Sequence, residues 1–387
     1  MASAATALQS GVHMEPSIPP LFTTDPPIRD SLPTESSRLQ EETIDEVLPF
    51  LKGEEHEQCN SHGLPHLDRR RHVNFLHKQL GKLPAAFTSA DPSRPWFFYW
   101  CLSALVLLGE DVEVYRERLV DTVRPMQNSD GGFAGGFGHT SHLATSYATV
   151  LSLALVGGED AYECIDRRAM WRWLCSLKQP DGGFQMALGG EEDVRGAYCA
   201  AVIISLLNLP LELSQDSPAR SAGHTGLFAG LADYVHRCQT HEGGVSAKPG
   251  IEAHGAYAFC ALGCLSIIDS PHRAIPRHWV GGCWPLIEAA LNGPRSGPGG
   301  EEANTGGHPL PAAQDSLFSR DGLIRYILCC CQDQSKRGGL RDKPSKWTLD
   351  AARPLEADMK GDSWSVTPYM EGEQIFDEED RVATVHP

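Results

Sequence analysis

The fold is decided by Gln127-Asn-Ser-Asp-Gly-Gly-Phe133, because this stretch returns along the chain. Its copies are Gln179-Pro-Asp-Gly-Gly-Phe184, Gln239-Thr-His-Glu-Gly-Gly-Val245, and Gln332 followed by Gly338-Gly-Leu340. A glycine pair allows positive φ angles and a close approach of the backbone to a neighbouring segment. Each copy follows one predicted helix and precedes the next, so the repeating unit is a helical hairpin that cannot bury its apolar face alone. Such hairpins stack into an open solenoid or close into an α/α toroid.

The segments between the copies have the periodicity of helices. Apolar residues recur at helical spacing in four stretches, residues 96–109, 143–157, 196–209 and 254–268. Little alternates with a period of two, which predicts an all-α protein with few strands. The repeats begin their glycine pairs at residues 131, 182, 243 and 338, so the intervals are 51, 61 and 95 residues. The last interval is close to two periods, and one hairpin region is therefore predicted to be incomplete.

The composition and charge of the chain exclude some classes of function. The chain has 387 residues, and 33 Lys and Arg against 50 Asp and Glu give a formal charge of −17. This balance argues against a nucleic-acid binder, whose affinity comes from neutralising phosphates, although a local basic cluster can still bind a small anion. The longest apolar stretches are far shorter than the ~20 residues that span a bilayer, and the N-terminus lacks the pattern of a signal peptide. We therefore expect a cytoplasmic protein without membrane insertion.

The 12 cysteines do not indicate disulfide bonds. Several lie inside apolar runs, where a free cysteine behaves as a small buried hydrophobe. Three are consecutive, at residues 329–331. In the cytosol such thiols stay reduced.

The chain divides into three parts by composition. Residues 1–36 are rich in Pro, Ser and Thr and are predicted to be a disordered leader. Residues 37–346 form the toroid domain, which opens with an acidic helix over about 40–60. Within this domain, residues 270–320 are disrupted, and 292–314 read as a flexible insert. Residues 347–387 form an acidic C-terminal tail.

Five motifs together are highly specific. They are Arg94-Pro-Trp-Phe-Phe-Tyr-Trp100, Gly131-Gly-Phe-Ala-Gly-Gly-Phe137 with His142-Leu-Ala-Thr-Ser-Tyr147, Ser176-Leu-Lys-Gln-Pro-Asp-Gly-Gly-Phe184, Asp193-Val-Arg-Gly-Ala-Tyr-Cys199 and Glu252-Ala-His-Gly-Ala-Tyr-Ala-Phe-Cys260. With them the sequence resembles the protein farnesyltransferase β subunits, over residues 40–270 and 279–346. The resemblance implies an α/α toroid around an aromatic-lined funnel and a prenyltransferase enzyme. It also implies an α subunit as partner, and transfer of farnesyl from farnesyl diphosphate to the Cys of proteins that end in CaaX.

The resemblance also implies site residues. His254 and Arg195 are expected at the diphosphate and the pocket rim, with Tyr257 supporting them. The other candidates line the isoprenoid wall or face the apolar CaaX side chains, and they are Tyr198, Cys260, Trp279, Trp96, Trp100 and Ala144. Each has a simpler alternative: His254 as a hydrogen-bonded core histidine, and Trp96 and Trp100 as ordinary core aromatics four residues apart.

The sequence departs from the family where zinc is bound. The family uses zinc to activate the thiol, with an Asp and a Cys from an Asp-Gly-Cys-Tyr-Ser stretch, which follows a basic segment. Here Ser270-Pro-His-Arg-Ala-Ile-Pro-Arg277 runs directly into His278-Trp-Val-Gly-Gly-Cys-Trp284. The basic segment and the stretch that contains the Asp and Cys ligands are both missing. The third ligand, a His, should follow Lys346, where an unrelated run begins.

No zinc ligand is therefore identifiable. Zinc needs roughly tetrahedral N, S or O ligands, and a replacement site from Cys283, His272 and His278 is disfavoured. Asp342 matches a family carboxylate that is linked to Mg²⁺, and a solvated turn residue is an equal alternative.

The leading hypothesis is a protein farnesyltransferase β subunit by ancestry that has little or no transferase activity, because its zinc ligands are missing. One alternative is a non-catalytic protein that binds the α subunit or the isoprenoid, and its zinc content would distinguish it from the enzyme. Another is an incorrect gene model of the enzyme, which the genomic DNA around codons 277 and 346 would reveal.

Overall fold

The structure is a computed structural model, and it describes residues 32–53, 55–56, 59–60, 62–83, 85–241, 243–269, 320–333, 338–341 and 343–344. The chain divides into two compact units. The first is drawn from Met1–Phe75 and Phe318–Ile375, and the second from Leu76–Leu317 and Phe376–Pro387. Most of the predicted leader, the disrupted segment with its insert at 292–314, and the acidic tail at 347–387 lie outside the described residues.

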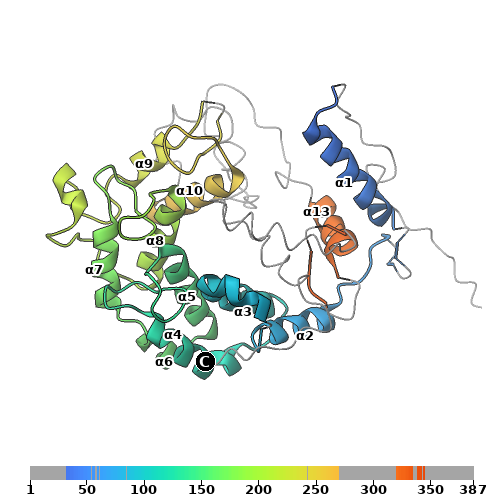
Figure 1. Cartoon of the computed structure of the whole chain (residues 1–387), viewed down its shortest axis with the longest axis horizontal. Helices are drawn as coiled ribbons and strands as arrows, with labels where there is room; N and C mark the ends of the chain where they lie inside the picture. The colour runs from blue at the N-terminus through green and yellow to red at the C-terminus, as the bar shows by residue number, and fades with distance from the viewer. Residues whose placement is uncertain are drawn as a thin grey trace, which may run out of the picture. The chain divides into compact units, whose positions relative to one another are not determined.

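The four predicted apolar helices are all present in the second unit. They are α3 (Arg94–Leu107), α5 (Leu143–Val156), α8 (Val194–Leu206) and α10 (Gly255–Ile268). In chain order α3 packs on α5, α5 on α8, and α8 on α10 (Figure 1). We call these four helices the central row. The prediction of helices from the apolar periodicity is confirmed.

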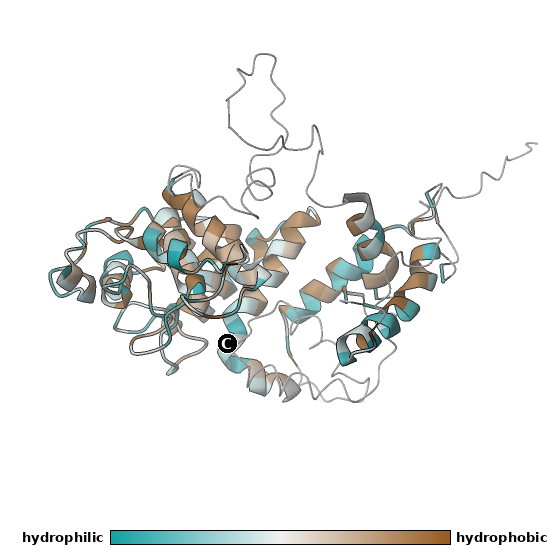
Figure 2. Cartoon of the chain, turned by 90° about the horizontal axis from the view of Figure 1, so that it is seen from above, coloured by the Kyte–Doolittle hydropathy of each residue, from teal (hydrophilic) through white to brown (hydrophobic). Residues whose placement is uncertain are grey.

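Shorter helices precede the central row or connect its members. They are η2 (Ala85–Ser93), η3 (Glu113–Tyr115), α4 (Arg116–Val123), η4 (Arg124–Met126), α6 (Glu159–Glu163), α7 (Arg167–Leu177), η5 (Pro218–Ala222) and α9 (Leu231–Arg237). Both α4 and α6 pack against α5. Since most of α5 is consequently buried, its sequence is apolar on nearly all sides. Figure 2 shows mostly hydrophobic helices of this kind beside amphipathic ones.

Each copy of the repeat is a tight turn closed by one antiparallel bridge. The bridged pairs are Gln127 with Phe133, Lys178 with Phe184, Gln239 with Val245, and Gln332 with Leu340. In the part of the chain that the structure describes, the backbone pairs only through isolated bridges. The expected scarcity of strands is confirmed there.

The first glycines of the pairs have the positive φ angles and the close backbone contacts that the sequence predicts. Gly131 has a φ of 110°, and a Cβ placed on it would lie 2.1 Å from the carbonyl oxygen of Ala169. Gly182 has a φ of 99°, and its Cβ would lie 2.1 Å from the carbonyl oxygen of Gly230. These turns therefore need glycine both for the backbone conformation and for the close approach of another segment.

A fixed spacing links each turn to the helix that follows. The N-cap residues His142, Asp193 and His254 come nine residues after Phe133, Phe184 and Val245. Each cap side chain accepts a hydrogen bond from the backbone N–H two residues further on. Such a cap satisfies one of the unpaired N–H groups in the first turn of a helix. Equivalent positions in α5, α8 and α10 can therefore be compared directly.

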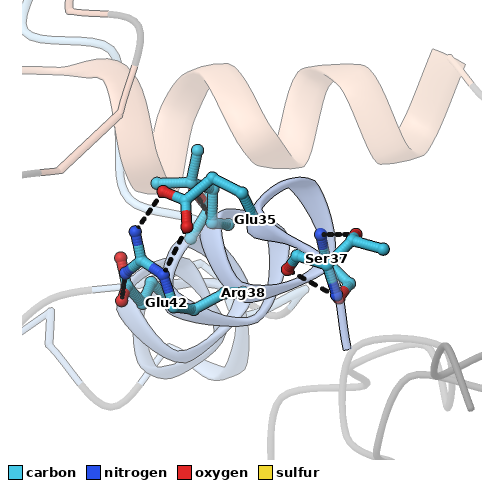
Figure 3. A network of polar contacts seen from close by, with 7 residues as sticks. Glu35, Ser37, Arg38 and Glu42 are labelled. Carbon is cyan, nitrogen blue, oxygen red and sulfur yellow. Dashed lines mark hydrogen bonds and ion pairs between the residues drawn. The ribbon is translucent and has the colours of Figure 1, made fainter. Parts of the chain in front are cut away.

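The first unit opens with α1 (Glu35–Lys52), which begins and ends earlier than the predicted helix at 40–60. Thr34 and Ser37 form a capping box, which Figure 3 shows together with the contacts of Arg38 to Glu35 and Glu42. The helix stops at Gly53, whose φ is 82°. Thr and Ser next to a helix thus act as caps here, although the sequence analysis counted them as signs of disorder.

The rest of the first unit packs around three consecutive cysteines. It contains the first part of α2 (Arg69–Gln79), α13 (Arg320–Tyr326) and the π-helix η7 (Ile327–Cys331). Val47 and Leu51 of α1 form an apolar cluster with the cysteines of η7. The fourth repeat turn is fixed by His72, whose Nδ1 accepts from the N–H of Gly339 at 3.0 Å.

The cysteines of the described residues are all free, and most are buried. Burial raises the pKa of the thiols of Cys260 and Cys264 to about 12, so both stay protonated at neutral pH. Among the described residues no helix has the length and apolar character needed to cross a membrane.

Candidate functional site

A line of aromatic rings runs across the central row. Tyr147, Tyr198 and Phe259 each lie five residues after the N-cap of their helix. The ring centroids of Tyr147 and Tyr198 are 5.7 Å apart, and those of Tyr198 and Phe259 are 5.6 Å apart. These are the separations of aromatic rings in contact. The repeat therefore places one ring per helix at the same level.

Helix α3 extends this line with its own aromatic residues. The ring centroid of Trp96 lies 5.7 Å from that of Tyr147 and 5.4 Å from that of Trp100. The ring centroids of Tyr99 and Tyr147 are 6.0 Å apart. We call the set Trp96, Tyr99, Trp100, Tyr147, Tyr198 and Phe259 the aromatic row. Two of its members, Trp96 and Trp100, were predicted to face the isoprenoid. The contacts bring them together with Tyr198, a predicted wall residue.

The aromatic row has a closely packed support and a partly open surface. A Cβ on Gly263 of α10 would lie 2.6 Å from the ring of Tyr198, so the two helices approach closely at that point. Cys260, also on α10, packs against the buried cluster beneath, and Ala144 is buried at the start of α5. Phe259, in contrast, is 66% exposed. The row can therefore offer apolar surface to a ligand.

Arg195 lies on the first turn of α8, three residues before Tyr198 of the aromatic row. Its Nε donates to the Oδ2 of Asp193 at 2.9 Å, and its guanidinium lies 5.7 Å from the ring centre of Tyr257. Burial acts to lower the pKa of Arg195, but the contact with Asp193 outweighs it and raises the pKa. The side chain is thus a firmly held cation, stacked on an aromatic ring.

His254 lies beside the same tyrosine. Its Nδ1 accepts from the N–H of Ala256 at 3.1 Å, and its ring centroid is 5.5 Å from that of Tyr257. The Nε2 atom is therefore the ring nitrogen that carries a hydrogen and can donate to a ligand. His254 is exposed, which contradicts the alternative of a buried core histidine. The structure brings the three predicted rim residues, His254, Tyr257 and Arg195, into one group.

The remaining predicted site residues cannot be placed. Trp279 and Asp342 lie outside the described residues, as do Cys283, His272 and His278. Among the residues that the structure does describe, no three His, Cys, Asp or Glu side chains come close enough to hold a metal ion. The described residues therefore do not fit a zinc site.

Sequence reasoning missed Tyr99, Tyr147 and Phe259, although the repeat could have identified two of them. Aligning the helices on their N-caps places Tyr147 and Phe259 at the position of Tyr198, which was predicted. The signal was in the spacing between turn and cap, which the motif comparison did not use.

Lys178 was also passed over, although it lies inside a quoted motif. With Met170 and Leu174 it continues the fully buried face of α7 at four-residue intervals, where a lysine is unusual. Its Nζ donates to the carbonyl oxygen of Gly182 at 2.5 Å and lies 4.6 Å from the ring centre of Phe184. Burial lowers the pKa of Lys178 to about 7. The second repeat therefore contains a buried amine that titrates near neutrality.

The chain is similar to several known proteins. The family model of the prenyltransferase alpha-alpha toroid domain matches residues 67–277 and 277–352, which confirms the predicted fold class. A protein farnesyltransferase subunit beta of Pyricularia oryzae is 52% identical and covers 96% of this chain and 81% of its own. One from Schizosaccharomyces pombe is 35% identical and covers 81% and 80%. Among solved structures, Candida albicans protein geranylgeranyltransferase-I complexed with GGPP has a TM-score of 0.49 at 18% identity, covering 73% of this chain and 87% of that chain.

Two features of these matches concern the disrupted region. The family model matches in two segments that meet at residue 277, where the sequence analysis finds a segment missing. The alignment to the Pyricularia oryzae relative has 425 positions, 38 more than the 387 residues of this chain. At least that many positions therefore hold residues of the relative that this chain lacks.

Proposed function

Because the chain belongs to the protein farnesyltransferase β subunits, a family of prenyltransferase enzymes, we propose that it binds farnesyl diphosphate along the aromatic row. With an α subunit as partner, it presents the isoprenoid to the Cys thiol of proteins that end in CaaX. The observation that carries the proposal is that α8 and α10 carry both members of the aromatic row and the group of His254, Tyr257 and Arg195. An apolar wall with a cation on one of its helices suits a ligand with a lipid tail and an anionic head.

The farnesyl tail and the diphosphate would be bound by different interactions. Each CH₂ of the farnesyl tail that leaves water against the rings gains about 0.8 kcal/mol. The diphosphate would lie at the first turns of α8 and α10, where the positive ends of the helix dipoles and the guanidinium of Arg195 favour an anion. Arg195 and Tyr198 are three residues apart on α8, so head and tail can be held on one side of that helix.

The reaction that the family resemblance implies is a substitution at C1 of the isoprenoid. A sulfur–carbon bond forms while the bond from C1 to the diphosphate oxygen breaks, the thiol proton passes to solvent water, and diphosphate leaves with the electron pair of the broken bond. Arg195 and the Nε2–H of His254 are suited to stabilise the charge that develops on the leaving group. The aromatic row would keep water away from C1.

The compartment and the second candidate function also rest on specific observations. Free, buried thiols are typical of a reducing compartment, which supports the cytoplasm. The second candidate is binding of the isoprenoid or the α subunit without turnover. It is favoured by the junction at residue 277, across which the family's zinc-ligand stretch is missing from the sequence.

Removing the central ring of the row tests the proposal. Tyr198→Ala removes an aromatic ring that the farnesyl tail would contact. We expect farnesyl diphosphate to bind about 30- to 100-fold more weakly, equivalent to about 2–3 kcal/mol. Isothermal titration of the purified chain measures this loss. Inorganic pyrophosphate, which has no tail, should bind both proteins equally. Tyr198→Phe keeps the ring and should retain the affinity.

The matched control is Tyr162→Ala on α6, where the side chain is 55% exposed and outside the aromatic row. This variant should bind farnesyl diphosphate as the wild type does. Equal losses for Tyr198→Ala and Tyr162→Ala, or none for Tyr198→Ala, would refute the assignment of the row.

The head-group assignment is tested at Arg195. Arg195→Gln removes the cation, and we expect about 10- to 100-fold weaker binding of both farnesyl diphosphate and pyrophosphate. Arg195→Lys should recover part of the loss, because a charge returns without the planar fork. Arg172→Gln on α7, an exposed arginine, is the control. Pyrophosphate affinity that is unchanged in Arg195→Gln would contradict a role in binding the diphosphate.

A further inference from the structure

The first two repeat turns contain an aspartate at the same place. Asp130 and Asp181 each accept from a glycine N–H two residues further on, both at 3.0 Å. In the first repeat the hydroxyl of Ser141 donates to the Oδ1 of Asp130 at 2.7 Å. Ser141 directly precedes the N-cap of α5. A proton donor from this position therefore holds the turn to the start of the next helix.

Glu192 takes the place of Ser141 in the second repeat, since it directly precedes Asp193, the N-cap of α8. Its Oε1 lies against Gly183, the residue whose N–H donates to Asp181, so the two carboxyl groups lie beside the same glycine, and Asp181 is one of the groups that shift the pKa of Glu192. Two carboxylates so placed cannot both be ionised at low cost, so one of them carries a proton. Because the serine is the donor in the first repeat, the equivalent donor here is Glu192.

The surroundings of Glu192 suit the neutral form. Its Oε1 is buried, with no N–H or O–H donor in hydrogen-bonding distance among the described residues. A Cβ on Gly183 would lie 1.9 Å from this atom, so the second glycine of the turn provides the space that the carboxyl group fills. A buried carboxylate without donors would be costly, whereas a carboxylic acid that donates to Asp181 is satisfied.

We propose that Glu192 is a positioning residue that, as a neutral carboxylic acid, donates its proton to Asp181 and thereby holds the start of α8 in place. Asp193 follows immediately, and it both caps α8 and holds the guanidinium of Arg195. Through this connection the proton on Glu192 fixes a cation at the rim of the site. The structural part of the inference is independent of the ligand, and its consequence for binding rests on the proposed function.

The charged groups around Glu192 agree with this assignment. Burial, followed by the contact with Asp181, raises the pKa of Glu192 to about 8. Burial acts to raise the pKa of Asp181 as well, but the contact with Glu192 and the N–H of Gly183 lower it overall. Arg237 and Lys178 act against the shift of Glu192. Tyr234 and Cys238 of the α9 segment also face the pair.

The direction of the pH effect follows from the raised pKa. A carboxyl group whose pKa is higher in the folded state stabilises the fold fully below its unfolded pKa, 4.5, and this contribution is lost as pH rises through about 8. Above that pH the negative charges of residues 181, 192 and 193 repel one another at the start of α8. Lys178 titrates in the same range, and the charge of Glu192 acts to raise its pKa, so the variants also change the titration of Lys178. A measurement that reports on the carboxyl group alone therefore accompanies the unfolding experiment.

The repeats supply the variants for the test. Glu192→Gln keeps a neutral donor, Glu192→Ser copies the first repeat, and Glu192→Ala copies the third, where Ala253 precedes the cap. Thermal unfolding of the full chain is followed from pH 5 to pH 9. We expect Glu192→Gln and Glu192→Ser to gain stability relative to the wild type as the pH rises. Glu192→Ala should be less stable than the wild type at pH 5, with a difference that shrinks towards pH 9.

A second measurement looks at the proton directly. The infrared difference spectrum between wild type and Glu192→Gln at pH 7 should contain the C=O band of a protonated carboxylic acid, which disappears above about pH 8. Absence of this band at pH 7, or a stability difference between wild type and Glu192→Gln that is constant from pH 5 to pH 9, overturns the inference.

The positioning role has its own readout. Affinity for farnesyl diphosphate should fall above about pH 8 in the wild type and stay level in Glu192→Gln. The same pH dependence in both proteins overturns the positioning role. If neither protein binds farnesyl diphosphate at any pH, the proposed function fails, and the infrared and unfolding results decide on the proton alone.

Discussion

Replacing Gly182 by alanine is expected to cost about 4 kcal/mol of unfolding free energy, in the range reached only by severe core defects. Two effects add at this position. The φ of 99° is unfavourable for a residue with a side chain, and the new Cβ would lie 2.1 Å from the carbonyl oxygen of Gly230. That oxygen belongs to the backbone, so no flexible side chain can move aside. Urea unfolding of the full chain, followed by tryptophan fluorescence, measures the loss.

Gly189 provides the matched control within the same repeat. Its φ is 74°, but a Cβ there would meet nothing within 4 Å. Gly189→Ala should therefore show only the conformational cost, about 1 kcal/mol. The difference between the variants isolates the close approach of the repeat turn to its neighbour. Equal losses at the two positions would show that conformation alone, and not packing, requires glycine in the turn.

Much of the fold was predictable because the repeat is built from local features of the sequence. Turn, helix and N-cap recur at fixed spacing, and each follows from local chemistry: glycine for positive φ, apolar periodicity for the helix, and a side-chain acceptor for the cap. The four helices of the central row and the turns at 127–133 and 179–184 could be derived in this way. The start of α1 could not, because Thr34 is as compatible with a disordered segment as with a capping box.

The candidate site was only partly predictable for a related reason. The family resemblance indicated His254, Arg195, Tyr257 and Tyr198, because each lies inside a motif. Lys178 lies inside a motif too, yet its interest comes from burial against Phe184 and from neighbours on α10, and such contacts are tertiary. The pairing of Glu192 with Asp181 is of the same kind, since nothing in the local sequence shows that two acidic residues share a proton. Titration of buried groups is thus learned from packing, whereas their positions follow from the repeat.

The second large effect concerns transfer itself. Purified with the proposed α partner in the presence of zinc, the chain should hold far less than one zinc ion. It should also transfer farnesyl about 1,000-fold or more slowly than the Pyricularia oryzae relative with its own α partner. An unactivated thiol is only a few per cent thiolate at pH 7, whereas a metal-bound thiol is fully deprotonated. Missing cations beside the leaving group can cost a further 100- to 1,000-fold. Metal analysis and single-turnover assays measure the two quantities separately.

A chimera identifies the cause. We would insert, after Arg277 and after Lys346, the segments of the Pyricularia oryzae relative that align at these two positions. If the missing segments are the defect, zinc content should rise to one ion per chain and transfer should recover, while the affinity for farnesyl diphosphate changes little, because the aromatic row and Arg195 are untouched. Binding and turnover would then be separated in one molecule. One zinc ion per unmodified chain, together with a rate near that of the relative, would show instead that other residues complete the metal site.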